Sequence, residues 1–347
     1  AGGDLPQAKA NEYQVIGTAY AGVPFTTSGG PAECVRIMTG APMPPGTDTV
    51  VMQEQCKVIK DDRVQIGTGH RAGQNVRQAG EDIAKGNQVL TRGHRLTPAD
   101  IGVLASLGFG EISLYRRPRV AFFSTGDEVR SIGETLRAGE VYDRNRYSLF
   151  GMLQRQDVEI FDLGVVPDDP EALRKTFNSA AAIADLVISS GGVSVGEADY
   201  TRTILQELGQ MNFWKIAMKP GRPLSFGQLG GAWFFGLPGN PVAVMVTFYQ
   251  FVLPALEYLA TGKAHQPFTL NAVCTEAIRK RPGRFEFLRG VYTQEPDGGL
   301  SVARVGQQGS GILTSMSRGN CFIQLTEDCA GVSPGDKVRI QPFIAFQ

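Results

Sequence analysis

The feature that most constrains the fold is an alternation of short apolar runs with helix-like segments between residues 118 and 262. Apolar runs with the length of strands occur at 119–123, 158–161, 186–188, 213–217 and 233–235. Helical patterning occurs between and after them, at 144–155, 170–183, 200–208 and 241–260. Strands that alternate with helices predict a parallel sheet with right-handed crossovers and helices on its faces. We therefore predict a central doubly wound α/β domain over 118–262.

The sequence on either side of this domain has a different pattern. Residues 13–66 alternate short apolar runs with glycine and proline, which predicts an N-terminal β-rich region with tight turns. From 268 onward short strands and glycine turns return, which predicts a small C-terminal β-domain. The 347 residues are too many for one ordinary core. We divide the chain into a β-rich region (1–85), a helical connection belonging to an N-terminal domain (86–117), the α/β domain (118–262) and the C-terminal β-domain (263–347).

A helix is expected directly after Thr97 in the helical connection. Thr97 suits the N-cap, Pro98 the first helical position, and Gly108 the stop. The apolar residues of this segment recur at helical spacing and predict one buried face. They are Ile101, Leu104, Ala105 and Leu107.

Composition narrows the class of protein. Lysine plus arginine number 34, as do aspartate plus glutamate, and this balance gives no support for a nucleic-acid partner. No apolar run approaches the roughly 20 residues that span a bilayer, so we expect no membrane span. The five cysteines are scattered and form no Cys-x-x-Cys pair, which predicts reduced thiols in a cytoplasmic protein. The three histidines lie far apart, which argues against a histidine-rich metal site.

Four polar loops each follow an apolar, strand-like run, and such loops are where an open α/β sheet gathers its ligand. In order they are Ser124-Thr125-Gly126-Asp127-Glu128, then Ser190-Gly191-Gly192 continuing to Ser194, Glu197 and Asp199, then Lys219-Pro220-Gly221-Arg222-Pro223, and last Leu237-Pro238-Gly239-Asn240-Pro241. Glycines let backbone N–H groups approach a phosphate, and hydroxyls with carboxylates suit a hard cation. Together the loops predict a site for a phosphate-bearing or oxyanionic ligand, with acids available to hold a metal ion.

Each loop taken alone also has a simpler interpretation. Asp127 and Glu128 suit a solvated turn whose acids cap a helix, and Asp168 suits the favourable end of a helix dipole. Thr39 and Asp82 lie in what are, by their residues alone, glycine turns. The best anion-binding candidates are the cations in and before the third loop, for which a surface basic cluster is the alternative. They are Lys215, Lys219 and Arg222.

The four loops, in this order and spacing, resemble those of the molybdopterin molybdenumtransferase family (molybdenum insertases, the MoeA group), which includes the E domain of gephyrin. Further motifs extend the resemblance over nearly the whole chain: Arg36-Ile37-Met38-Thr39-Gly40-Ala41-Pro42, Gly80-Glu81-Asp82-Ile83, Leu96-Thr97-Pro98, Gln308-Gly309-Ser310 and Gly319-Asn320. The resemblance implies that adenylylated molybdopterin and molybdate are converted to molybdenum cofactor and AMP with a divalent cation, usually Mg²⁺. It also implies an elongated homodimer, with molybdopterin adenylyltransferase and molybdoenzyme apoproteins or chaperones as possible further partners.

The resemblance assigns roles by position in this sequence. Four residues match catalytic positions of the family: Asp168, Asp199, Lys215 and Lys219. Two more, Thr39 and Asp82, match catalytic positions that a partner subunit supplies in the family. Asp127 and Glu128 match an acidic pair after the first strand, and we assign them with Asp199 to the metal. Ser194 and Pro238 match loop positions near the ligand. The remaining loop residues that we assign to ligand binding are Ser124, Thr125, Gly126, Gly191, Gly192, Arg222, Gly239 and Asn240.

Two features depart from the family pattern. Arg222 stands where the family commonly has the second lysine of Lys-Pro-Gly-Lys-Pro, which keeps the charge and adds a planar fork. The family's N-terminal motif Met-Asp-Gly-Tyr-Ala has no match, and the chain begins at Ala1, so we expect an upstream segment to be missing. The alternatives are a single-domain molybdopterin adenylyltransferase, which would not need the β-rich flanks, a gephyrin-like scaffold with a peptide groove, and a relative of nucleotide pyrophosphatases.

Overall fold

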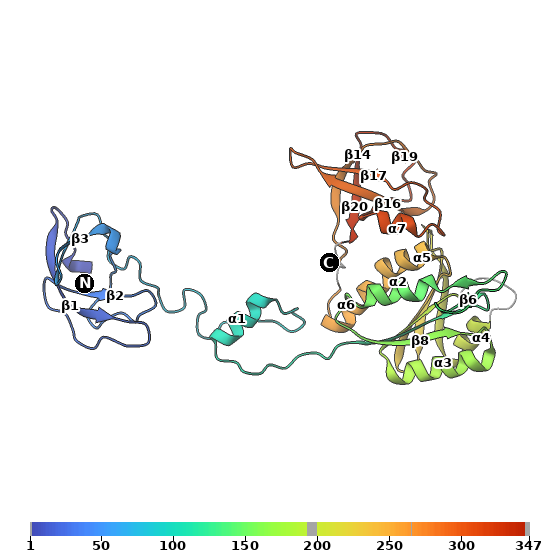
Figure 1. The fold of residues 1–347 in the computed structure, drawn as a ribbon, viewed down its shortest axis with the longest axis horizontal. Coiled ribbons are helices and arrows are strands. Elements are labelled where there is room, and N and C mark those ends of the chain that lie inside the picture. The colour runs from blue at the N-terminus through green and yellow to red at the C-terminus, as the bar shows by residue number, and fades with distance from the viewer. Residues whose placement is uncertain (1, 193–199, 265, 344–347) are drawn as a thin grey trace. The chain divides into compact units, whose positions relative to one another are not determined.

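The computed structural model describes residues 2–192, 200–264 and 266–343 (Figure 1). They form two compact units, Ala1–Thr91 and Arg92–Gln347. The finer division of the second unit at residues 118 and 263 stays a prediction.

The first unit is a β-rich region, as predicted. Its sheet has the strand order β2-β1-β4-β3, with β1 parallel to β2 and antiparallel to β4, and β4 antiparallel to β3. The strands are β1 (Asn11–Ala19), β2 (Glu33–Ile37), β3 (Cys56–Lys60) and β4 (Arg63–Ile66), and the short helices are η1 (Gly2–Asp4) and η2 (Gln53–Gln55). Few of its apolar side chains are buried, chiefly Tyr13, Ala19 and Ile66.

The second unit begins with α1 (Pro98–Ser106), which starts at the predicted cap. The Thr97 hydroxyl accepts the Asp100 N–H while the Asp100 carboxylate accepts the Thr97 N–H, which is a capping box. The predicted buried face is wrong, because α1 has no buried residue and Ile101 is 59% exposed. Periodicity identifies an apolar face but not the element that covers it.

A six-stranded sheet with the order β10-β12-β13-β9-β5-β8 forms the centre of the second unit. The strands are β5 (Arg119–Thr125), β8 (Glu159–Val166), β9 (Leu186–Ser190), β10 (Gly209–Lys215), β12 (Pro223–Leu229) and β13 (Ala232–Leu237). β13, β9, β5 and β8 are parallel, whereas β12 is antiparallel to both β13 and β10. The prediction of a purely parallel sheet is therefore corrected to a mixed one. The unpredicted β12 turns back at Gly230 and Gly231 in a two-residue hairpin.

Helices cover both faces of this sheet, which confirms the doubly wound arrangement. Val120 and Phe122 of β5 pack in one core with α2 (Arg144–Leu153), α5 (Pro241–Thr247), the π-helix η3 (Phe248–Val252) and α6 (Leu253–Thr261). Ala121 and Phe123 point to the opposite face and pack with α3 (Pro170–Ile183) and α4 (Tyr200–Leu208). Figure 1 shows α2 and α5 between the sheet and the C-terminal strands, with α3 and α4 on the far side.

The stretch formed by α5, η3 and α6 bears on the expectation that the chain has no membrane span. Within residues 2–192, 200–264 and 266–343, Pro241–Thr261 is the one helix whose length and apolar composition would suit a bilayer, with a mean hydropathy of 1.5. In this structure 56% of an 18-residue window of this helix is buried inside the protein, and its side chains form much of the first core. A buried core helix passes the same test, so this one is weak evidence for a span.

The C-terminal strands close into a barrel. The order β11-β16-β17-β14-β20-β18 is completed by pairing between β18 and β16. The strands are β11 (Met218–Lys219), β14 (Leu270–Cys274), β16 (Phe285–Gln294), β17 (Leu300–Arg304), β18 (Cys321–Leu325) and β20 (Lys337–Pro342). Smaller elements are the paired β15 (Ile278–Arg279) and β19 (Gly331–Val332), the paired β6 (Val129–Arg130) and β7 (Val141–Tyr142), and α7 (Thr314–Arg318).

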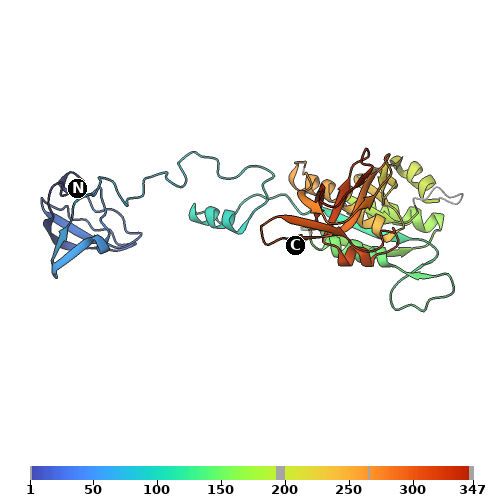
Figure 2. The same ribbon diagram turned by 90° about the horizontal axis from the view of Figure 1, so that it is seen from above.

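Strand β11 joins the barrel to the α/β sheet. Met218 and Lys219 lie between β10 and β12 in sequence but pair in parallel with Phe285 and Glu286 of β16. The barrel strands, orange to red, lie above the α/β sheet in Figure 1 and overlie it in the view from above (Figure 2). This pairing holds the third predicted loop against the barrel.

Candidate active site

A cavity of about 1090 Å³ lies between the α/β sheet and the barrel. Its lining includes the carboxyl ends of β5, β9 and β13, the loop after β8, the start of α2, the loop from β11 to β12, and part of β16. The predicted residues that line it are Ser124, Thr125, Gly126, Glu128, Asp168, Gly191, Gly192, Lys219, Arg222, Pro238, Gly239 and Asn240. All four predicted loops thus contribute to one cavity, while the role of each residue stays a prediction.

The end of β5 fixes two carboxylates at the cavity. Ser124 and Thr125 are buried, and their hydroxyls need acceptors. The Ser124 hydroxyl donates to Asp143 Oδ1 at 3.0 Å, and the Thr125 hydroxyl donates to Asp168 Oδ1. Both aspartates line the cavity, and Asp143 is only 3% exposed. The strand end therefore determines where these two acids lie.

The predicted metal ligands differ in position. Glu128 lines the cavity, whereas Asp127 does not. Asp127 Oδ1 instead accepts the N–H of Asp168 at 3.2 Å, and Asp168, which the sequence predicts to be catalytic, also lines the cavity. Asp199 and Ser194 lie outside the described residues. Among the described residues no three His, Cys, Asp or Glu side chains gather into a group that could hold a metal. Among the described residues, the carboxylates that line this wall are Glu128, Asp168 and Asp143, and Asp143 already pairs with Arg146.

The glycines after β9 are required by close backbone approach. Gly191 and Gly192 have φ of +93° and +64°. A Cβ on Gly191 would lie 2.3 Å from the Thr125 carbonyl oxygen, and one on Gly192 would lie 2.5 Å from the Thr201 hydroxyl. A side chain at position 191 would push the loop away from β5, and one at position 192 would push it away from α4. The glycines thus keep the loop close to Thr125 at the cavity wall.

The third loop brings cations to the cavity. Lys219 Nζ lies 3.5 Å from Glu286 Oε1, and the lysine remains half-exposed. Arg222 is exposed, lines the cavity and has no ion-pair partner among the described residues. Between them Gly221 has a φ of +101°, and a Cβ there would lie 2.7 Å from the Thr247 methyl group of α5. The glycine lets the loop pack on α5.

A buried arginine, Arg289 of β16, lines the same cavity from the barrel. Its side chain is fully buried, with Nε donating to Ser315 Oγ at 2.9 Å and Nη2 donating to the Gly309 carbonyl at 3.1 Å. No carboxylate pairs with it in the part of the chain that the structure describes. Burial lowers the pKa of Arg289 to about 10, so the guanidinium remains charged at neutral pH.

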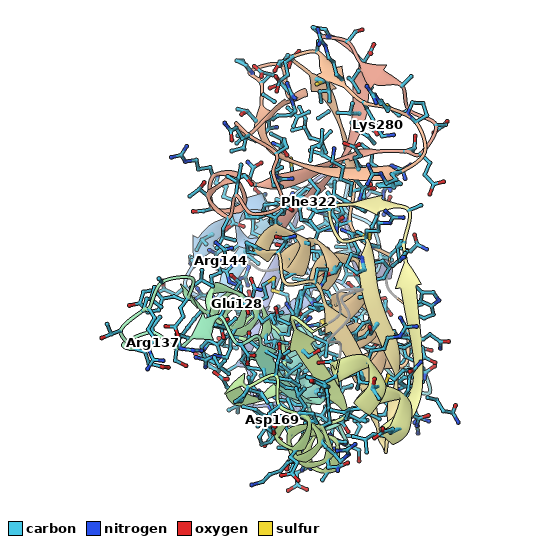
Figure 3. All side chains as sticks on the ribbon, turned by 90° about the vertical axis from the view of Figure 1, so that its right-hand side faces the viewer. Glu128, Arg137, Arg144, Asp169, Lys280 and Phe322 are labelled. Atoms are coloured by element: carbon cyan, nitrogen blue, oxygen red, sulfur yellow. The ribbon has the colours of Figure 1, made fainter. Side chains whose placement is uncertain are left out.

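The prediction from sequence missed Arg289 and several other lining residues. These include Asp143, Arg144, Asn145, Arg284, Gln308 and Ser310. Glu128 and Arg144, both labelled in Figure 3, come from opposite ends of the segment that joins β5 to α2. A lone arginine within the apolar run Phe287-Leu288-Arg289-Gly290 was the available signal for the barrel wall. Gln308 and Ser310 belong to the motif Gln308-Gly309-Ser310, which carries part of the family resemblance but predicts no role for either residue.

The comparisons with known proteins cover the chain in three parts. Residues 4–108 match the MoeA N-terminal region (domain I and II), and residues 271–343 match the MoeA C-terminal region (domain IV). Residues 121–258 match a probable molybdopterin binding domain. The molybdopterin molybdenumtransferase of Haemophilus influenzae is 45% identical over 341 residues, which are 98% of this chain and 84% of that protein. The chain belongs to the molybdopterin molybdenumtransferase family.

Other members and a solved structure agree with this assignment. The molybdopterin molybdenumtransferase of Nostoc is 36% identical over 322 residues, covering 89% of this chain and 72% of that protein. The solved structure of the molybdopterin biosynthesis MoeA protein from Pyrococcus horikoshii is 28% identical, with a TM-score of 0.82 over 99% of this chain and 84% of that chain. The chain is therefore a transferase of molybdenum cofactor biosynthesis. Matches on both flanks decide against a single-domain molybdopterin adenylyltransferase.

Three residues that the family resemblance marked as catalytic do not line the cavity. Lys215 ends β10 and is exposed. Thr39 and Asp82 lie in the first unit, where both are exposed. Thr39 occupies a turn closed by the Ala41 N–H and the Met38 carbonyl at 3.0 Å. Their catalytic roles remain predictions.

Proposed function

We propose that this transferase inserts molybdenum from molybdate into adenylylated molybdopterin and releases AMP. The names of its relatives support the reaction class, and the cavity supports the substrates. The observation that supports it most is the buried Arg289, which has no carboxylate partner among the described residues yet lines the cavity. A buried charge without a counter-ion is costly, and an anionic substrate such as molybdate would supply the missing charge.

The two walls of the cavity suit different parts of the reaction. Lys219, Arg222 and Arg289 suit molybdate, which is a tetrahedral dianion. The glycine loop after β9 and the hydroxyls that end β5 suit the phosphoryl groups of the adenylylated pterin. With both substrates held, the chain's main task is to place molybdate beside the dithiolene sulfurs of the pterin. Cations near the phosphoryl oxygens also stabilise the charge that develops when the anhydride bond breaks.

The described residues fit a role for Mg²⁺. This ion is usually held by one or two carboxylates together with substrate phosphates and water, rather than by a complete cage of protein ligands. Asp168 and Glu128 on the cavity wall would hold it, and Asp199 is a further predicted ligand. When bound, Mg²⁺ would neutralise charge on the phosphoryl oxygens. The Asp168 carboxylate accepts a hydrogen bond from the Thr125 hydroxyl, and the Asp168 N–H donates to Asp127. These two bonds keep the Asp168 loop in position to hold the ion.

We further propose a homodimer in which Thr39 and Asp82 complete the site of the partner subunit. Their exposure in the first unit supports this role. Lys215, at the end of β10, would contribute a positive charge to the same site as Lys219. The chain would act in the cytoplasm, receiving its substrate from an adenylyltransferase and passing its product to molybdoenzyme apoproteins or their chaperones.

The decisive experiment is incubation of the chain with adenylylated molybdopterin, molybdate and Mg²⁺, with AMP release followed over time. We expect AMP release to require both molybdate and the divalent cation. Consumption of ATP without any dependence on molybdate would indicate an adenylyltransferase instead. A chain that binds substrate but releases no AMP under any condition would favour a scaffold function. Sedimentation of the chain tests the dimer, and AMP release by mixtures of Asp82→Ala and Asp168→Ala chains tests the shared site, because mixed dimers should recover part of the activity.

A further inference from the structure

The first turn of α2 contacts the parallel strands that carry the site. Asp143, the N-cap of α2, accepts the Ser124 hydroxyl of β5 at 3.0 Å. Arg146 donates to Asp143 Oδ2 at 3.1 Å and to Asp162 Oδ2 of β8 at 2.7 Å. Asp143 and Arg146 are at least nine-tenths buried, so the bonds from Ser124 and Arg146 to Asp143 are shielded from water, whereas the Asp162 side chain is 34% exposed. Two side chains from one turn therefore fix β5 and β8.

Asn145 does the same for the other two parallel strands. Its Nδ2 donates to Ser190 Oγ at the end of β9, at 2.9 Å, and to the carbonyl of Gly239 after β13, at 2.7 Å. The Gly239 carbonyl can only accept, which requires that the NH₂ group of the amide faces it. Both amide hydrogens are thus used between the two loops. Asn145 Oδ1 is buried and has no partner among the described residues.

The position of Asn145 coincides with the place where β9 and β13 separate. The register of this strand pair ends at Ser190 and Leu237, and the Gly191 N–H donates to the Leu237 carbonyl at 3.2 Å. Beyond these residues the segment after β9 enters the glycine loop, and the segment after β13 enters Pro238-Gly239-Asn240. The Asn145 amide joins these two segments at the point where backbone hydrogen bonds of the sheet no longer join them.

We infer that Asn145 is a positioning residue that sets the separation of the two substrate loops, acting through Ser190 and Gly239. This inference rests on the proposed function for its catalytic consequence, but the bridge itself does not depend on it. Because one loop is proposed to hold phosphoryl groups and the other lines the cavity beside the cations, a change in their separation would misplace the reacting groups. Misplacement of about 1 Å costs on the order of a hundredfold in rate.

Two substitutions separate the donated hydrogen bonds from side-chain volume. Asn145→Ala removes the bridge, and Asn145→Asp keeps the shape while offering no N–H to Ser190 or Gly239. The matched control is Ser148→Ala on the same helix, because the Ser148 hydroxyl bonds only the Arg144 carbonyl, at 2.9 Å, among the described contacts. We expect both Asn145 variants to lower kcat by about a hundredfold, with KM within about threefold of wild type.

Hydrogen exchange tests the bridge without reference to catalysis. In both Asn145 variants the amides of Gly191 and Gly192 should exchange at least about tenfold faster than in wild type, while those in β5 do not change. Ser148→Ala should match wild type in exchange and in kcat. If wild type releases no AMP, the proposed reaction fails, and the exchange rates alone still decide on the bridge.

Several results would overturn the inference. Wild-type exchange in the Asn145→Ala variant would show that the loops do not depend on the amide. An Asn145→Asp variant with wild-type exchange and kcat would show that shape suffices. Faster exchange throughout the second unit, with a matching fall in the unfolding midpoint, would show that Asn145 supports the fold and not the loops.

Discussion

The two walls of the cavity present opposite chemistry by different structural means. The α/β wall presents glycines, hydroxyls and carboxylates at strand ends, where backbone geometry places them, and Glu128 there is exposed. The barrel wall presents Arg289 from the middle of β16, fully buried and held by Ser315 and Gly309. The first wall resembles a phosphate and metal site. The second resembles a receptor for one desolvated anion.

The difference between the walls shows that holding their polar groups in place costs different amounts of folding free energy in the protein without ligand. The loops of the α/β wall form their hydrogen bonds within the protein, as between Thr125 and Asp168, and their placement costs little in the free protein. Arg289 keeps a charge at neutral pH although its side chain is fully buried. The barrel wall therefore loses stability in the free protein and would recover it on binding an anion.

The largest expected effect comes from neutralising the barrel wall. Arg289→Met should lower AMP release at limiting molybdate by about a hundredfold or more, since truncating a buried, hydrogen-bonded charge pair costs on the order of 2–5 kcal/mol. The thermal unfolding midpoint of the free protein should equal or exceed that of wild type, because an apolar side chain of similar length fills the site and the buried charge is removed. A molybdate titration of AMP release, with thermal unfolding of both proteins, measures both quantities.

The control for this variant is a second arginine of the barrel. Arg304 forms an ion pair with Glu276 at 2.9 Å and does not line the cavity. Arg304→Met should leave the molybdate titration unchanged while lowering stability modestly. An unchanged titration for Arg289→Met would remove the barrel wall from anion binding and with it the contrast between the walls.

The second prediction concerns the α/β wall. Asp168→Asn keeps an oxygen for the Thr125 hydroxyl but removes the charge that a hard cation requires. We expect the Mg²⁺ concentration for half-maximal AMP release to rise by about tenfold or more, since a charge-assisted contact is worth roughly 1.5–3 kcal/mol. The apparent affinity for molybdate should change little. A variant that loses molybdate affinity and keeps the wild-type Mg²⁺ titration would show that the walls are not chemically separate.

The sequence predicted the α/β wall far better than the barrel wall, for a physical reason. Loop residues such as Gly191 and Asp168 follow buried strands, and the carboxyl ends of parallel strands meet at one edge whatever the rest of the chain does. The doubly wound domain follows from the same local alternation of patterns. Arg289 becomes part of the site only because β16 pairs with β11, a contact between residues far apart in sequence. No local pattern encodes such a pairing.

The errors have the same origin. The antiparallel β12 was missed because Pro223 and Gly227 weaken its strand pattern, while pairing on both sides stabilises it. Ile101 of α1 was expected to be buried because its spacing is helical, although spacing does not supply a covering surface. Asp127 was grouped with metal ligands by its place beside Glu128. Its contact with the Asp168 N–H depends on the loop after β8, which lies about 40 residues further along the chain.

The third prediction addresses Lys219, which lies between the walls. Lys219→Ala should lower AMP release at limiting molybdate by about tenfold, the lower end of the range for a charge-assisted contact because the lysine is half-exposed. The variant also leaves the nearly buried Glu286 without its partner, which should lower stability. The double variant Lys219→Ala with Glu286→Gln should recover stability but not molybdate affinity. Recovery of both would mean that Lys219 serves only to neutralise Glu286.

The smallest effect is expected at Asp127, and it distinguishes a metal ligand from a residue that holds the α/β wall in shape. Asp127 accepts the Asp168 N–H at 3.2 Å and does not line the cavity, so its carboxylate acts on the loop of Asp168. Asp127→Asn retains an oxygen for that N–H and should lower AMP release by no more than about threefold, whereas Asp127→Ala should lower it by about fivefold to tenfold, as expected for one lost hydrogen bond. The Mg²⁺ titration midpoint of Asp127→Asn should match wild type, because the loop keeps its shape. A different result would show that the charge of Asp127 itself is needed. In that case Asp127→Asn would require much more Mg²⁺ than wild type, and Asp127→Ala would require no more Mg²⁺ than Asp127→Asn does. Asp127 would then be a metal ligand beside Glu128, as the sequence predicts.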